Sequence, residues 1–134
     1  MLFLKEEHHQ VREMARKFAD GVLAPRAREL DEQEEFPHDI VKQMCELGFM
    51  GLPFPEKYGG AGLDNLAYII AVEEISRVCA STGITLAAHV SLGCGPVYAN
   101  GTEEQKMKFL VPMAKGEAIE IGRASCRERV YVLV

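Results

Sequence analysis

The sequence of 134 residues has no tryptophan and few positive charges, with 15 basic residues against 20 acidic ones and a formal net charge of −5. Contacts to a phosphate backbone require a stripe of lysine and arginine, and the first hundred residues contain no such stripe. We therefore expect no nucleic acid among its partners. No apolar run reaches the ~18 residues of a membrane span, and the opening residues lack the pattern of a signal peptide. These absences predict a soluble protein that is not exported.

Patterns typical of disulfide and metal sites are missing too. The four cysteines form no CxxC pair, which predicts reduced and mostly buried thiols. They are Cys45, Cys79, Cys94 and Cys126. His8 and His9 would point about 100° apart on a helix, and neither His38 nor His89 has a ligand three or four residues further on. We expect no metal site.

The chain is rich in helical periodicity. Apolar residues from Lys5 to Leu30 recur every three or four positions, as in an amphipathic helix, which Pro25 is expected to kink or restart. The acidic run at 31–35 is predicted to be a solvated connection. A second helix is expected from Pro37 to a left-handed stop at Gly48. Its predicted buried face consists of Ile40, Val41, Met44 and Leu47.

The stretch GLPFPEKYGGAG cannot continue a helix and is predicted to be a loop. Its glycines lack the GxGxxG spacing, so we expect no dinucleotide cradle there. Asp64 should cap a third helix that runs to about Cys79. Within that helix, Glu73 and Glu74 are interpreted as surface charges, because no histidine follows them at the spacing of a di-iron site.

The next segment, TGITLAAHVSLGCGPV, is apolar nearly all round and is predicted to be a central helix enclosed by the others. Its small residues leave two interpretations open. They serve tight helix packing, or they form the wall of a narrow apolar pocket. In the second case Leu86, Val90 and Leu92 supply apolar surface and Ser91 a polar point. His89 is expected to be a hydrogen-bonded core residue.

A capping box at Thr102–Gln105 then opens a short helix through Leu110. The sequence as a whole predicts one all-α domain, a bundle of about five helices.

Three stretches resemble, in order and spacing, the amino-terminal helical domain of the acyl-CoA dehydrogenase family. They read ELGFMGLPFPEKYGGAGLD, EEISRVCASTG and NGTEEQKMKFLVPMAKGE. The segments Pro55–Gly62 and Gly101–Lys106 are specific in combination, and CASTG before a helix of small residues is most similar to short-chain, butyryl-type members. We assign residues 1–119 to this domain.

The resemblance implies an FAD enzyme that oxidises acyl-CoA to 2,3-enoyl-CoA in fatty-acid or amino-acid catabolism. A glutamate removes the α-proton, a hydride passes to the flavin, and an electron-transfer flavoprotein takes the electrons. The full-length enzyme is expected to be a homotetramer, in a bacterial cytoplasm or, for a processed chain, the mitochondrial matrix. The helical domain supplies part of the acyl cavity, which makes Leu86, Val90, Ser91 and Leu92 its predicted wall.

The resemblance stops at Ile119, before the flavin-binding β-domain of the family begins. No residue of the 134 matches the family's flavin-contacting or proton-abstracting motifs, so no catalytic or cofactor-binding residue is assigned. We expect a fragment that neither binds FAD tightly nor turns over acyl-CoA. The alternative is a stand-alone helical module that binds acyl chains or a partner, with an apolar face prone to aggregation or dimerisation.

The final stretch, IEIGRASCRERVYVLV, places three arginines around Cys126 and ends apolar. Its part GRASCRERV resembles the translation of a common DNA-sequencing adapter that begins within the codon of Glu120. The adapter next reads a stop, so it does not account for Tyr131–Val134. We expect residues 120–134 to be a non-native tail without a function. The structural alternative is a helical extension or a short strand.

Overall fold

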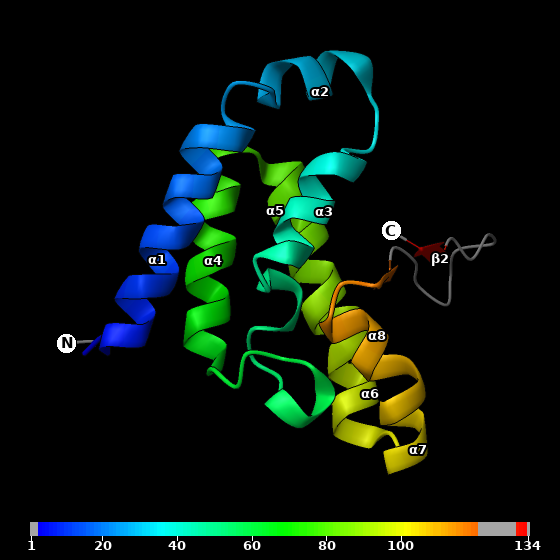
Figure 1. The fold of residues 1–134 in the computed structure, drawn as a ribbon. Helices are drawn as coiled ribbons and strands as arrows, with labels where there is room; N and C mark the ends of the chain where they lie inside the picture. Colours follow the sequence, from blue (N-terminus) through cyan, green and yellow to red (C-terminus); the bar gives the residue numbers. More distant parts are fainter. Residues whose placement is uncertain (1–2, 121–130, 134) are drawn as a thin grey trace.

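The computed structural model describes residues 3–120 and 131–133, which fold mainly into helices (Figure 1). The α-helices are α1 (Glu6–Phe18), α2 (Ala27–Gln33), α3 (His38–Glu46), α4 (Asn65–Val78), α5 (Ala80–Ala88), α6 (Gly95–Asn100), α7 (Glu103–Gln105) and α8 (Val111–Ala114). The π-helical turns are η1 (Ala19–Leu23), η4 (His89–Cys94) and η5 (Lys106–Leu110), and the 3-10 turns are η2 (Phe49–Gly51) and η3 (Glu56–Tyr58). The all-α prediction is confirmed.

Each π-helical turn ends two residues before a proline. η1 precedes Pro25, η4 precedes Pro96 and η5 precedes Pro112. A proline ring removes one backbone donor and collides with the carbonyl four residues earlier, and the wider π turn accommodates that loss. The helix therefore continues past Pro96 and Pro112. The predicted end at Leu110 was wrong, because η5 leads directly into α8.

The helical segments of the described residues consequently join into six rods. α1 continues into η1, α5 continues through η4 into α6, and α7 continues through η5 into α8. We call residues 80–100, which comprise α5, η4 and α6, the α5 rod. α4 packs against α1 on one flank and against α5 on the other (Figure 1). This arrangement places α4 between two different neighbours.

The acidic run is partly helical, which corrects the prediction of a connection. Its first three residues belong to α2, the helix that restarts after Pro25 as expected. The side chains of Arg28 and Glu32, four positions apart, lie 2.8 Å from each other and support the exposed face of this short helix. α2 ends at Gln33 and is followed by the C-cap residue Glu34, whose φ of 54° is left-handed.

α3 buries Ile40, Val41 and Met44, as predicted. Gly48 has a φ of 77° and confirms the left-handed stop. Leu47 was wrongly placed on the buried face. It caps the helix end, where its side chain turns outward and is 40% exposed.

The core lies where the rods meet, and it is almost entirely apolar. Its larger fully buried side chains are Leu23, Ile40, Met44, Phe49, Met50, Leu52, Tyr58, Ile75, Leu86, Leu110 and Ile119. Gly83 explains part of the small-residue character of α5. A Cβ atom at Gly83 would lie 1.9 Å from Ser76 Oγ, so glycine lets α5 approach α4 closely.

The α5 rod is not enclosed by the other helices, contrary to the prediction. Ile84 is 68% exposed and Leu92 is 59% exposed, on the side of the rod that no described helix covers. An apolar residue pattern all round a helix does not distinguish burial inside one domain from a face that meets something outside it.

Two strands follow the helices. β1 (Ala118–Glu120) pairs antiparallel with β2 (Tyr131–Leu133), and Ala118 lies opposite Leu133. The predicted non-native tail covers residues 120–134, of which 121–130 and 134 lie outside the described residues, and its origin stays a prediction. None of the helices formed by the described residues is long and apolar enough to cross a membrane.

Candidate functional site

The loop between α3 and α4 is held by close backbone contacts. A Cβ atom at Gly60 would lie 2.1 Å from the carbonyl oxygen of Phe54, and one at Gly59 would lie 2.6 Å from the Lys115 side chain. The space around these glycines is therefore filled by the chain itself. The turn prediction is confirmed, and the loop offers no open cradle for a phosphate group.

The start of α4 is fixed by its predicted cap. Asp64 Oδ1 accepts the backbone N–H of Ala67 at 2.9 Å. The preceding loop is tied to α7 by Tyr58, whose hydroxyl donates to Glu103 Oε1 at 2.7 Å. These two bonds position the loop and the first turn of α4 beside the α5 rod.

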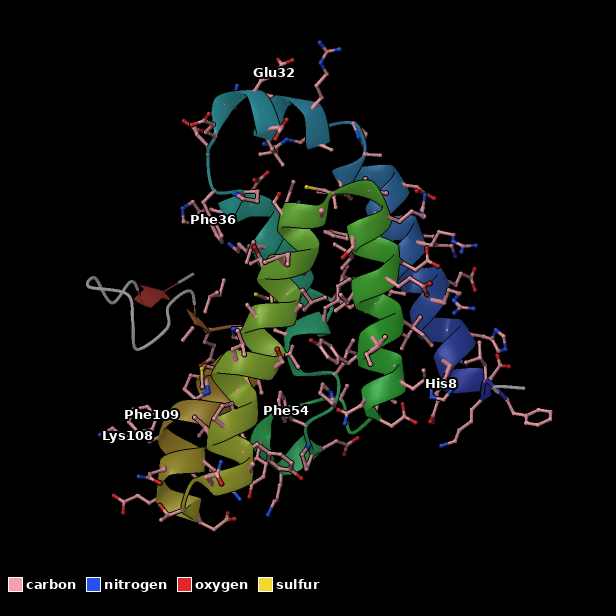
Figure 2. All side chains as sticks on the ribbon, turned by 180° about the vertical axis from the view of Figure 1, so that it is seen from behind. His8, Glu32, Phe36, Phe54, Lys108 and Phe109 are labelled. Atoms are coloured by element: carbon pink, nitrogen blue, oxygen red, sulfur yellow. The ribbon has the colours of Figure 1, made fainter. Side chains whose placement is uncertain are left out.

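A cavity of about 640 Å³ opens between the loop, the first turns of α4 and the α5 rod. Figure 2 faces α4 and the α5 rod and labels Phe54 near their lower parts. The cavity is lined by Pro53, Phe54, Leu63, Asp64, Asn65, Tyr68, Ile69, Val90, Ser91, Gly95 and Tyr98. Most of this wall is apolar or aromatic, with a few polar groups, which is typical of a pocket for an organic ligand.

Two hydroxyl groups of the cavity wall donate to the rod backbone. Ser91 Oγ donates to the carbonyl oxygen of Ala87 at 2.5 Å, and Tyr68 Oη donates to the same oxygen at 3.1 Å. Burial raises the pKa of the Tyr68 phenol, which stays protonated at neutral pH. The wall is therefore uncharged at the positions where α4 and the rod meet.

The four predicted wall residues fall on three sides of the rod. Val90 and Ser91 line the cavity. Leu86 is fully buried in the core, and Leu92 is exposed on the outer side. Leu92 and Ile84, together with Ile69 on α4, form what we call the open strip, three apolar side chains that are each more than half exposed.

Sequence reasoning missed the contribution of α4 and the loop to the cavity. Tyr68 and Ile69 lie one turn after Asp64 and Asn65, so the four share one side of the helix start. That spacing was visible in the sequence. The contact between Phe54 and Tyr98, whose ring centroids lie 5.5 Å apart, was not visible in the sequence, because the two residues are 44 positions apart.

On the other flank of α4, Glu74 corrects a prediction. It is 3% exposed, not a surface charge. Arg16 of α1 binds it with two bonds, from Nε at 3.0 Å and Nη2 at 2.7 Å, while Arg77 Nε lies at 3.4 Å and Arg12 Nε at 3.7 Å. Arg16 in particular holds the pKa of the Glu74 carboxyl below its ordinary value.

Glu73 is exposed, as predicted, and its carboxylate lies 3.7 Å from Arg12. The two glutamates therefore have different roles, and only Glu74 is enclosed. Three arginines around one buried carboxylate satisfy its charge and lock α1 against α4. The arrangement is structural.

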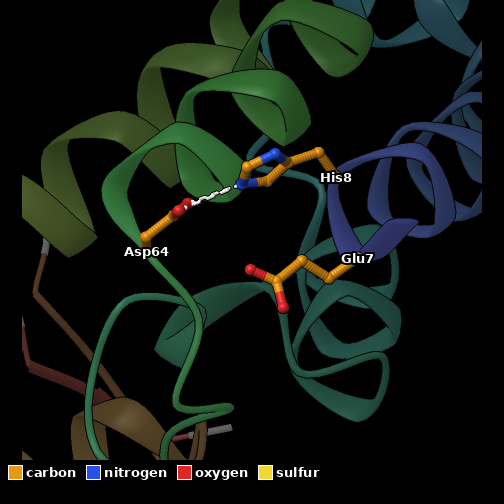
Figure 3. A group of neighbouring side chains, drawn as sticks. All are labelled: Glu7, His8 and Asp64. Carbon is orange, nitrogen blue, oxygen red and sulfur yellow. Dashed lines mark hydrogen bonds and ion pairs between the residues drawn. The ribbon is translucent and has the colours of Figure 1, made fainter. Parts of the chain in front are cut away.

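His8, Glu7 and Asp64 bring three potential metal ligands within 4.8 Å of one another (Figure 3). His8 Nε2 lies 3.0 Å from both Asp64 oxygens, and His8 Nδ1 accepts the backbone N–H of Lys5 at 3.0 Å. Because Nδ1 accepts, Nε2 carries the ring proton and donates it to Asp64. A metal at Nε2 would displace this proton, so the group fits a hydrogen-bonded pair better than a metal centre.

His89 confirms the prediction of a core histidine. It is fully buried, and its Nε2 lies 3.0 Å from the carbonyl oxygen of Met113, to which it donates. Burial lowers the pKa of the imidazole, which keeps it neutral.

Cys45, Cys79 and Cys94 form no disulfide with one another, as predicted. Only Cys94 is fully buried. Burial raises the pKa of Cys45 to about 11, which makes it a poor nucleophile. Cys126 lies outside the described residues.

Comparison with known proteins agrees with this fold. The model of the acyl-CoA dehydrogenase N-terminal domain matches residues 5–117. The short-chain specific acyl-CoA dehydrogenase of Clostridium acetobutylicum is 54% identical over 116 residues, which are 87% of this chain and 31% of that enzyme.

Two solved structures have the same fold. The butyryl-CoA dehydrogenase of Megasphaera elsdenii matches with a TM-score of 0.85 at 35% identity, over 92% of this chain and 34% of that one. A chain from a study of the electron transferring flavoprotein of Acidaminococcus fermentans and flavin-based electron bifurcation matches with a TM-score of 0.87 at 44% identity. The match covers 93% of this chain and 34% of that one. The chain spans about a third of the length of these relatives. Through this N-terminal domain, it belongs to the acyl-CoA dehydrogenase family.

Proposed function

We propose that this chain is the N-terminal helical domain of an FAD-dependent acyl-CoA dehydrogenase and supplies part of its acyl-chain cavity. The observation that carries the proposal is the mostly apolar surface beside α4 on the side of the α5 rod. The cavity and the open strip together present mostly apolar surface beside α4 and the α5 rod, with the Asp64 carboxylate in the cavity wall. An acyl tail is recognised by apolar surface of this kind.

The proposed reaction oxidises an acyl-CoA thioester to the 2,3-enoyl-CoA, with the α-proton taken by a glutamate of a longer polypeptide. FAD would accept the hydride, and an electron-transfer flavoprotein would reoxidise it. The Acidaminococcus match supports a partner of that type. This chain's own part is to exclude water from the acyl tail through Val90 in the cavity and Leu92 in the open strip, and to shape the wall around Ser91.

The described residues do not fit FAD by themselves. The glycine-rich loop is filled by Phe54 and Lys115, and the described residues form no glycine-rich turn between a strand and a helix N-terminus that could hold its pyrophosphate. We propose that the 134 residues alone bind FAD weakly at most and do not oxidise acyl-CoA. The 31% of the Clostridium acetobutylicum enzyme that they match is consistent with this proposal.

A chimera tests the proposal. Residues 5–117 replace the corresponding segment of the Clostridium acetobutylicum enzyme, and FAD content and butyryl-CoA oxidation are measured with an artificial electron acceptor. We expect a yellow, active enzyme, because the fold and more than half of the aligned residues are shared. A soluble, folded chimera that lacks activity, beside an active parent enzyme, would contradict the proposal.

The isolated chain distinguishes the alternative of a stand-alone module. Isothermal titration with butyryl-CoA should show no stoichiometric binding, because two thirds of the relatives' length is needed to complete the cavity. Tight binding to the isolated chain, together with an inactive chimera, would favour a binding module without catalysis.

A further inference from the structure

We infer that Tyr68 is a specificity-determining residue, which sets the width of the cavity between α4 and the α5 rod and so favours straight over branched acyl groups. The inference rests on the proposed function, since it takes this cavity as part of the acyl site. Tyr68 lies near the start of α4, is half-buried and lines the cavity.

The side chain of Tyr68 bridges the two helices. Its ring extends from α4, and its hydroxyl donates to the backbone carbonyl oxygen of Ala87 in the rod at 3.1 Å. Ser91 Oγ, one turn further along the rod, donates to the same oxygen at 2.5 Å. The Ala87 carbonyl is therefore the point at which cavity-lining residues of both helices are joined.

A direct contact fixes the distance between the same two helices at another position. A Cβ atom at Gly83 would lie 1.9 Å from Ser76 Oγ and 3.0 Å from Ser76 Cα, so α5 and α4 are in close contact there. At Tyr68, by contrast, a whole phenol ring stands between them. Because packed helices are stiff and hardly compressible, these two contacts together determine how far the rod lies from α4 at the cavity.

The cavity walls begin where Tyr68 meets the rod. The lining residues of the two helices are Val90, Ser91 and Gly95 on the rod and Asn65, Tyr68 and Ile69 on α4. A straight acyl chain between these walls needs the width of one methylene chain, whereas a branched chain needs room for an additional methyl group. A gap that is held by a rigid aromatic ring resists this expansion. Branching of the acyl tail is therefore the substrate property that Tyr68 should control.

The chimera with the Clostridium acetobutylicum enzyme tests the inference, through the ratio of kcat/KM for 4-methylpentanoyl-CoA to that for hexanoyl-CoA. Both acyl groups have six carbon atoms and react at the same two of them. Tyr68→Leu shortens the spacer and should raise the ratio about tenfold, the effect of one methyl group in a hydrophobic pocket. Tyr68→Phe keeps the ring and loses the bond to Ala87, and it should raise the ratio about threefold.

The control is Phe109→Leu, the same kind of aromatic-to-leucine change at an exposed position outside the cavity lining. It should leave the ratio unchanged. A general loss of stability lowers both kcat/KM values together, so the ratio separates specificity from folding. Tyr68→Phe preserves the packing of the ring and supplies the test if Tyr68→Leu does not fold.

The outcomes distinguish the inference from the proposed function. An active chimera in which the Tyr68 variants leave the ratio unchanged overturns the inference alone. A ratio that rises equally in Phe109→Leu overturns it too, because the effect would not come from the cavity. A folded chimera that oxidises neither substrate contradicts the proposed function, and the inference falls with it.

Discussion

The two flanks of α4 are built on opposite principles. Towards α1, a buried carboxylate is surrounded by three arginines, and a second polar link joins His8 to Asp64. Towards the α5 rod, small residues allow close packing, and the outer side chains are apolar and exposed. The first flank surrounds its buried carboxylate with arginines of the same domain, whereas the exposed apolar side chains of the second form a surface suited to being covered. The comparison separates the structural side of the domain from the proposed functional side.

Removal of Glu74 should have the largest effect on the complete flank. Glu74→Ala leaves Arg12, Arg16 and Arg77 facing one another without their shared partner. The free energy of unfolding should fall by about 3 kcal/mol, as when one member of a buried ion pair is removed. Urea unfolding measures the loss. Glu73→Ala, which removes an exposed neighbour, should change stability by less than about 0.5 kcal/mol. Equal effects of the two variants would contradict the distinction between them.

The contribution of Glu74 should also depend on pH. Its pKa in the folded state lies below the ordinary 4.5 because of Arg16. The stabilisation is therefore complete above that ordinary value and is lost as pH falls through the lower, folded-state pKa. In urea unfolding at a series of pH values, the stability difference between the wild type and Glu74→Gln should shrink on acidification below about pH 4.5. A difference that grows in acid would show the opposite sign and refute the assignment.

Gly83→Ala should separate α4 from α5. The new Cβ would meet Ser76 Oγ at 1.9 Å and Ser76 Cα at 3.0 Å, so the two helices must move apart. We expect a net loss of about 2 kcal/mol in urea unfolding, after the gain in helix propensity is included. Gly21→Ala is the matched control, because a Cβ there meets nothing within 4 Å. It should leave stability unchanged or raise it by up to about 1 kcal/mol.

The open strip should contribute least to the stability of the chain itself. Ile84→Ser and Leu92→Ser should each change the free energy of unfolding by less than about 0.5 kcal/mol, because both side chains are mostly exposed. Leu86→Ser, in the buried side of the same rod, should cost about 3 kcal/mol or more. Urea unfolding of the three variants distinguishes the sides, and large losses at all three positions would show that the strip is already part of the core.

The features that the sequence predicts best are local. The Asp64 cap, the left-handed Gly48 and the capping box at Thr102–Gln105 each depend on residues within four positions, and all three are present. The role of Glu74 was missed because Arg16 and Arg12 reach it from another helix, 58 and 62 positions away in the sequence. The periodicity of apolar and charged residues shows which side of a helix faces another element. It does not show which side chains that element presents.

The candidate site divides in the same way. Val90 and Ser91 were predicted as wall residues from one helix, and they line the cavity. Its remaining wall comes from Gly95 and Tyr98 of the same rod, from α4 and from the loop at Phe54, which is held by packing of Gly60 against backbone atoms of residues 51 and 54. Leu92 is exposed in the open strip and is not among the residues that line the cavity, and its role as a wall residue stays a prediction.

The central claim is that the cavity and the open strip, which includes Leu92, face the acyl chain. It is tested most directly in the chimera with the Clostridium acetobutylicum enzyme, by the ratio of kcat/KM for hexanoyl-CoA to that for butyryl-CoA. This ratio does not depend on how much enzyme is folded. Leu92→Ala should raise it about tenfold, because the space left by the side chain accepts additional methylene groups. Met107→Ala, at another exposed apolar position, should leave it unchanged. An unchanged ratio for Leu92→Ala would contradict the claim.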